Sequence, residues 1–140
     1  MARVSRAKSF IRYWLPLLAY VVLIFSLSSM PRLRPPFGFL NADKVIHMGE
    51  YSVLGWLTGR ALHTVPAMSG LGASGLAAIA LGGAIGATDE LYQSTVPGRE
   101  SSVLDWAADF LGVVLSQVAY AWYKRPRSDR VSAPPDTRER

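Results

Sequence analysis

The stretch AMSGLGASGLAAIALGGAIGAT, residues 67–88, carries no charged side chain. A helix needs about 20 consecutive apolar residues to cross the roughly 30 Å hydrocarbon core of a bilayer. Because lipid cannot satisfy backbone N–H and C=O groups, a segment of this length must be helical. Small residues recur at every fourth position from Ser74 to Gly86, and this spacing allows a second helix to approach closely. The stretch therefore predicts a membrane-spanning helix that packs against protein neighbours.

Three more apolar segments of similar length accompany this one, at about 13–29, 45–62 and 103–123. Pro66 lies in the very short turn that joins the second and third segments, so these two form an antiparallel helical hairpin. We therefore predict an all-α fold, in the form of a compact four-helix transmembrane bundle.

Composition also favours a single membrane domain, residues 13–123. A chain of 140 residues of which 50% are hydrophobic is too short and too apolar for two soluble domains. Much of its Lys and Arg content lies in the flanks, residues 1–12 and 124–140, so the net charge of +5 indicates membrane topology and not nucleic-acid binding. The tail, rich in charged residues, Pro and Ser, is predicted to be disordered. The absence of cysteine excludes disulfides and thiolate metal sites.

The distribution of basic residues predicts the orientation. Most of the 15 Lys and Arg residues fall on the side of the two termini. The exceptions are Arg32, Arg34, Lys44 and Arg99. By the positive-inside rule both termini are cytoplasmic. The segment 13–29 also has features of a cleavable signal peptide, and that alternative would leave three spans.

Most of the 10 acidic residues form three clusters, within 43–51, 89–100 and 105–109. A charged side chain near the bilayer centre costs roughly 2.5–3.5 kcal/mol, so an ionisable residue there indicates a functional site by default. With cytoplasmic termini, all three clusters meet at the extracytoplasmic end of the bundle.

In the first cluster Asp43, His47 and Glu50 are spaced i, i+4 and i+7 and share one helix face, with Tyr51 beside them. Asp43 could accept a hydrogen bond from one imidazole nitrogen and leave the other as acid or base. The structural alternative is that Asp43 caps the helix and His47 bonds a neighbouring helix.

The last cluster places Asp105 and Asp109 one helical turn apart. Two like charges in a partly dry site repel, so either one carboxyl is protonated or a cation lies between them. The candidate cations are protonated His47, Arg99 and a metal ion. An N-cap role would explain Asp105 but poorly explains the deeper Asp109.

The middle cluster is predicted to lie in the outer loop, where Asp89, Glu90 and Gln93 precede Arg99. The Arg99 guanidinium could bind a phosphate or carboxylate of a ligand, or pair with acidic residues and lock the loop. Several oxygen ligands with one imidazole suit Mg²⁺, Mn²⁺ or Ca²⁺. A divalent cation is not favoured, however, because no spacing resembles a known metal signature, and no residue is assigned as a metal ligand.

At these residues the chain resembles the VanZ-like family of small membrane proteins, named for a protein associated with teicoplanin resistance. The matching parts are Ile24 to Pro31, Asp43-Lys44-x-x-His47-x-x-x-Tyr51, Asp89-Glu90-x-x-Gln93, Pro97-Gly98-Arg99 and Asp105-x-x-x-Asp109. Where the family often carries Asn, this chain has Asp109. The resemblance implies a multi-pass protein of the bacterial plasma membrane that is connected with the cell envelope. It implies no defined reaction, and teicoplanin resistance does not transfer to every member.

These observations predict an extracytoplasmic polar pocket that binds or modifies an anionic envelope lipid or a lipid-linked precursor. If the protein is an enzyme, His47 is the acid or base, oriented by Asp43. The other residues expected in the site are Asp89, Glu90 and Asp105 as catalytic partners, and Arg99, Gln93, Tyr51, Glu50 and Asp109 as ligand-binding groups. One alternative is a non-catalytic protein whose polar cluster joins the helices. Another is a transporter or ion pathway.

Overall fold

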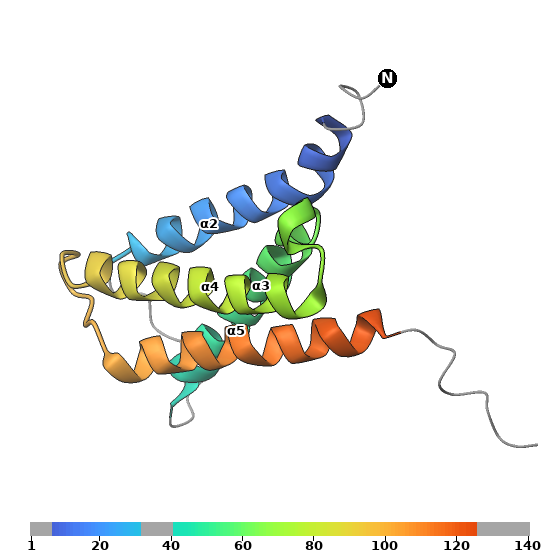
Figure 1. Cartoon of the computed structure of the whole chain (residues 1–140). Coiled ribbons are helices and arrows are strands. Elements are labelled where there is room, and N and C mark those ends of the chain that lie inside the picture. Colours follow the sequence, from blue (N-terminus) through green and yellow to red (C-terminus); the bar gives the residue numbers. More distant parts are fainter. Residues whose placement is uncertain (1–6, 32–40, 126–140) are drawn as a thin grey trace, which may run out of the picture.

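The computed structural model describes residues 7–31 and 41–125, and every regular element in these ranges is helical (Figure 1). A π-helical turn at Phe10–Trp14 leads into α2 (Leu15–Ser28), and α3 (Ala42–Leu62) follows. A 3-10 turn at Pro66–Met68 precedes α4 (Leu71–Gln93), and α5 (Val103–Lys124) is the last helix. The predicted all-α fold is confirmed. Most of the tail for which the sequence predicts disorder lies outside the described residues.

Three of the helices are long and apolar enough to cross a membrane, namely Ala7–Ser28, Leu71–Gln93 and Val103–Lys124. The protein is therefore a multi-pass membrane protein by length and composition. The helix α3 is not among them, because polar residues along its length, including Asp43, His47, Glu50 and Arg60, lower its mean hydropathy. The sequence predicts four spans, and the observed hydropathy supports three.

The boundaries of α4 differ from the prediction. The helix begins at Leu71 and not at Ala67, since Pro66 opens a separate 3-10 turn. It also continues beyond Thr88, the predicted end, to Gln93. Placing Asp89, Glu90 and Gln93 in an outer loop was therefore wrong.

The helix α3 packs against the other three helices (Figure 1). The helix α4 lies between α2 and α5, and α3 crosses behind them and contacts all three, most extensively α5. The apolar core includes Tyr51 and Leu54 of α3 and Val113 of α5. Because three helices pack against it, the face of α3 that they cover tolerates polar residues that a lipid-facing surface would not.

Close contact between α3 and α5 depends on glycine. A Cβ at Gly112 would collide with the backbone carbonyl of Met48 and would lie 3.0 Å from the Ser52 nitrogen. A Cβ at Gly55 would lie 2.9 Å from the Val113 Cα. At this crossing, small residues therefore permit the close approach of the two helices.

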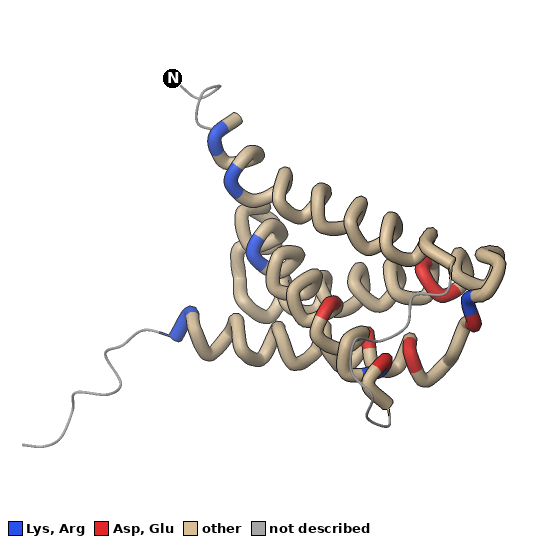
Figure 2. Tube along the Cα trace, turned by 180° about the vertical axis from the view of Figure 1, so that it is seen from behind, with Lys and Arg blue, Asp and Glu red and all other residues tan. Residues whose placement is uncertain are grey.

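The outer surface is apolar and the charges separate to the two ends of the molecule (Figure 2). Large side chains on the outer faces are strongly exposed, with Val22 at 66%, Leu76 at 72% and Val118 at 65%. One end carries basic residues, among them Arg12, Arg60 and Lys124, which lie around one hollow (Figure 2). The Asp and Glu residues of the described helices gather toward the opposite end. We call this second end the acidic end, and it contains all three predicted clusters.

Candidate functional site

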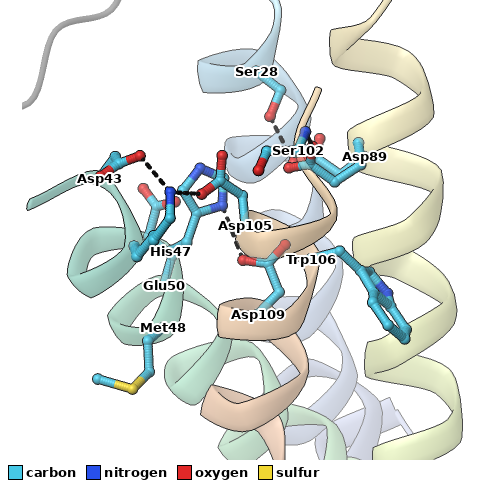
Figure 3. A network of polar contacts seen from close by, with 12 residues as sticks. Ser28, Asp43, His47, Met48, Glu50, Asp89, Ser102, Asp105, Trp106 and Asp109 are labelled. Atoms are coloured by element: carbon cyan, nitrogen blue, oxygen red, sulfur yellow. Dashed lines mark hydrogen bonds and ion pairs between the residues drawn. The ribbon is translucent and has the colours of Figure 1, made fainter. Parts of the chain in front are cut away.

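Polar side chains from all four long helices converge at the acidic end (Figure 3). They come from the C-terminal turns of α2 and α4 and from the N-terminal turns of α3 and α5. The main participants are Ser28, Asp43, Lys44, His47, Tyr51, Asp89, Glu90, Gln93, Asp105 and Asp109. Many of them are buried, so the interior of the bundle is polar at this end.

The centre of the site is a pair formed by His47 and Asp109. His47 Nδ1 lies 2.9 Å from Asp109 Oδ1, and the Asp109 side chain is fully buried. The two residues come from the second turns of α3 and α5, close to the point where Gly112 brings the two backbones together. A carboxylate that orients an imidazole in this way is the arrangement used in acid–base catalysis.

The prediction that Asp43 orients His47 was wrong. Asp43 Oδ2 instead accepts a hydrogen bond from Lys44 Nζ at 2.9 Å. Its side chain is 45% exposed, on the outer part of the site. The N-cap alternative is not the one observed either, because Asn41 occupies that position with a left-handed φ of 62°. Asp43 therefore belongs to the rim of the site.

Lys44 belongs to the site although its sequence position alone did not mark it as a candidate. Its Nζ also donates to Asp105 Oδ1 at 2.8 Å, and this bond joins α3 to α5. The hydrogen bonds to Asp105 and Asp43 raise the pKa of Lys44, and the bond from Lys44 lowers the pKa of Asp43. Lys44 lies three residues before His47 and so shares its helix face. That spacing could have identified it as the second cation.

The two neighbouring aspartates of α5 therefore have different partners. Asp105 pairs with Lys44, and Asp109 pairs with His47. Of the three candidate partners proposed from the sequence, His47 is the one that lies against Asp109. The N-cap of α5 is Ser102, whose Oγ accepts a hydrogen bond from Leu104 N at 3.2 Å, and so Asp105 is not the cap.

A second group of polar contacts ties α2 to the end of α4. Asp89 Oδ2 accepts hydrogen bonds from Ser28 Oγ and Gln93 Nε2, both at 2.9 Å. Gln93 Oε1 in turn accepts a bond from Arg99 Nη2 at 2.8 Å. These partners satisfy one oxygen of Asp89 in the last turns of the helix, so α4 does not end before the acidic residues. Arg99 binds the Gln93 amide, and not the acidic residues proposed as its partners.

The other residues of α3 and α4 extend the site inward. Glu90 Oε2 accepts a hydrogen bond from the backbone nitrogen of Ser102 at 2.7 Å, which holds the chain before α5. Tyr51 is 1% exposed. A Cβ at Gly86 would lie 3.2 Å from Tyr51 Cε1 and 3.4 Å from Asp109 Oδ2, so the ring and the carboxylate are neighbours. The Glu50 backbone carbonyl accepts a bond from Tyr20 Oη at 3.1 Å.

Several buried oxygens in this site have no hydrogen-bond partner among the described residues. They are Tyr51 Oη, Asp89 Oδ1, Glu90 Oε1 and Asp109 Oδ2. Ligand atoms of His47, Glu90 and Asp109 also lie within 4.8 Å of one another, so these three residues could hold a metal ion. An unsatisfied buried polar group costs about 1–3 kcal/mol, which makes a set of them unusual in a purely structural cluster.

Comparisons with protein families, with curated proteins and with solved structures find no match to this chain. The resemblance to VanZ-like proteins therefore rests on the short motifs alone. These motifs are the residues that the fold brings together at the acidic end.

Proposed function

We propose that this chain is a VanZ-like protein of the bacterial plasma membrane whose acidic end faces the extracytoplasmic side. In this proposal the buried site binds the polar head group of an envelope lipid or of a lipid-linked precursor. The observation that carries the proposal is the convergence of His47, Glu90 and Asp109 with unpartnered buried oxygens, inside a bundle whose outer surface is apolar. Ionisable groups held in such surroundings indicate a ligand or a reaction.

The chemistry of these groups suits a head group rich in hydroxyls. Carboxylate oxygens accept hydrogen bonds from hydroxyls, and the phenol of Tyr51 both donates and accepts. The pair of His47 and Asp109 supplies a group that takes or gives a proton at a bound hydroxyl. The apolar outer faces of α2, α4 and α5 give a lipid tail a surface beside the site.

A phosphate in the head group needs a cationic partner at the rim. Arg99 carries five N–H donors, and its bond to Gln93 uses Nη2. The remaining donors of its planar fork suit a phosphate oxygen pair. Arg99 follows the end of α4 and is only partly buried, so in this proposal it forms the entrance to the site.

The proposal is tested by mass spectrometry of lipids that co-purify with the full-length protein in mild detergent. We expect His47→Ala and Arg99→Ala to lose the bound lipid. His63→Ala is the matched control, because His63 is the other histidine of the chain, follows the opposite end of α3 and contacts the ring of Tyr120. Equal lipid content in all three variants and the parent protein would contradict the proposal.

A second candidate is a non-catalytic role in which the polar residues hold the helices together. The observation that favours it is the chain of hydrogen bonds from Ser28 through Asp89 and Gln93 to Arg99. If this role is the only one, Asp89→Ala and His47→Ala should both lower the melting temperature strongly, with lipid content unchanged. Retained stability with loss of lipid supports the binding site instead.

A further inference from the structure

We infer that His47, Glu90 and Asp109 form a binding site for a divalent metal ion, of the class that accepts both imidazole and carboxylate ligands, such as Mn²⁺ or Zn²⁺. The three residues come from three different helices, α3, α4 and α5. They meet at the acidic end, where Figure 3 shows His47 and Asp109 facing each other. Metal binding needs only these side chains, so the inference goes beyond the proposed lipid binding and does not depend on it.

The separations fit a coordination sphere. Bonds from such cations to nitrogen and oxygen are about 2.0–2.2 Å long, so neighbouring ligand atoms lie about 3 Å apart and opposite ones a little over 4 Å. His47 Nδ1 and Asp109 Oδ1 share a hydrogen bond at 2.9 Å, and an ion that replaces the shared proton would have both atoms as neighbouring ligands. One ligand atom from each of the three residues lies within 4.8 Å of the others. A single ion can therefore reach all three with small side-chain adjustments.

The unpartnered oxygens are a second observation that points to a ligand. Tyr51 is not one of the three ligand residues, yet its hydroxyl is buried and has no partner in the described part of the chain. The contacts around Gly86 place its ring beside Asp109 Oδ2, which is also unpartnered. Glu90 Oε1 is unpartnered too, while Glu90 Oε2 is occupied by the Ser102 backbone nitrogen. An ion with its bound water would satisfy these oxygens together.

The surrounding charges leave this position open for a cation. Lys44, the nearest lysine in sequence, is committed to Asp105 and Asp43 at the rim. Arg99 is bonded to Gln93. The buried centre therefore has carboxylates and one imidazole facing one another. Three protein ligands are fewer than such ions coordinate, so further positions remain for water or for an oxygen of a bound head group.

The inference also explains how an acidic site could accept an anionic head group. Carboxylates alone would repel a phosphate. A bound divalent ion reverses the local charge and offers a direct ligand position to a phosphate oxygen. Arg99 at the entrance would then assist an ion at the centre, and would not act alone.

The test uses the full-length protein in detergent, stripped with EDTA, dialysed and titrated with MnCl₂ or ZnCl₂. We expect one ion bound per chain by elemental analysis and calorimetry. The variants His47→Ala, Glu90→Gln and Asp109→Asn should each weaken binding at least ten-fold. Glu100→Gln is the matched control, because Glu100 is an exposed carboxylate outside the site, and this variant should bind as the parent protein does.

The parent protein alone also decides the matter, in case a variant does not fold. Failure of the parent protein to bind either ion would overturn the inference, as would parent-like affinity in all three variants. If the purified parent protein retains lipid but binds neither ion, this inference is overturned and the proposed function stands. Metal bound without any lipid would support this inference and count against the proposed function.

Discussion

At the residue scale, the partner of His47 shows what spacing along one helix does and does not determine. The i, i+4 relation places Asp43 and His47 on one face of α3, and this made Asp43 the expected partner. The same face of α3 packs against α5, however, where Asp109 Oδ1 lies 2.9 Å from His47 Nδ1. Asp43 is further out and bonds Lys44. The deeper carboxylate is the partner because it is buried and would otherwise lack a hydrogen-bond donor.

The ion pairs of Lys44 give a prediction for the pH dependence of stability. The folded protein raises the pKa of Lys44 above the ordinary 10.5, through its hydrogen bonds to Asp105 and Asp43. The resulting stabilisation is complete below pH 10.5 and is lost as the pH rises through the raised pKa. We expect Lys44→Gln to melt at a lower temperature than the parent protein at neutral pH.

Melting curves recorded from neutral to strongly alkaline pH check this expectation, and the difference between the two proteins should shrink only at the alkaline end. Arg60→Gln is the control, because Arg60 lies at the basic end and donates to the Arg12 backbone carbonyl. A constant difference between parent and Lys44→Gln at every pH would contradict the assigned ion pairs.

At the scale of elements, the crossing of α3 and α5 sets the geometry of the site. Gly112 is one turn beyond Asp109 and touches the α3 backbone at Met48, the residue after His47. The pair of His47 and Asp109 can meet only while the two backbones stay this close. A side chain at position 112 would push the helices apart and separate the pair.

We therefore expect Gly112→Ala to destabilise the protein by about 1–3 kcal/mol, the usual range for overpacking. The obstructing atoms are the backbone oxygen of Met48 and the nitrogen of Ser52, which cannot rotate away as a side chain can. Gly75→Ala on α4 is the control, since the methyl group that it adds would meet nothing within 4 Å. The stability of both variants is measured by unfolding in mixed detergent, monitored by circular dichroism. Equal stability of the two variants would contradict this packing.

The end of α4 was harder to predict than its middle. The apolar run ends at Thr88, and a helix that continues through Asp89 and Glu90 looks unfavourable from hydropathy alone. In the fold, Asp89 accepts hydrogen bonds from Ser28 and Gln93. Glu90 accepts a hydrogen bond from the backbone nitrogen of Ser102. These partners lie far away in the sequence, except for Gln93, so no local pattern could reveal them.

At the scale of the whole molecule, the charge separation bears on orientation. The basic end carries Arg60 and both ends of the described chain, while the acidic end holds the site. By the positive-inside rule the basic end is proposed to be cytoplasmic. Single cysteines test this cleanly, because the natural chain has none.

We expect Glu100→Cys in intact cells to react with a membrane-impermeant maleimide. Lys8→Cys should react only after the membrane is permeabilised. Both side chains are exposed, so differences in burial do not explain a difference in labelling. The reverse pattern would place the site on the cytoplasmic side and contradict the proposed location.

The sequence by itself determined the helical class, the membrane-spanning character and the gathering of acidic clusters at one end. These follow from hydropathy, helix length and the order of segments, which are read along the chain. Only the tertiary structure decided that His47 pairs with Asp109, that Lys44 joins Asp105, and that Glu90 and Tyr51 face the same buried centre. The physical reason is that partners on different helices depend on how closely and at what rotation the helices cross. At this site, backbone contact at Gly112 sets that crossing.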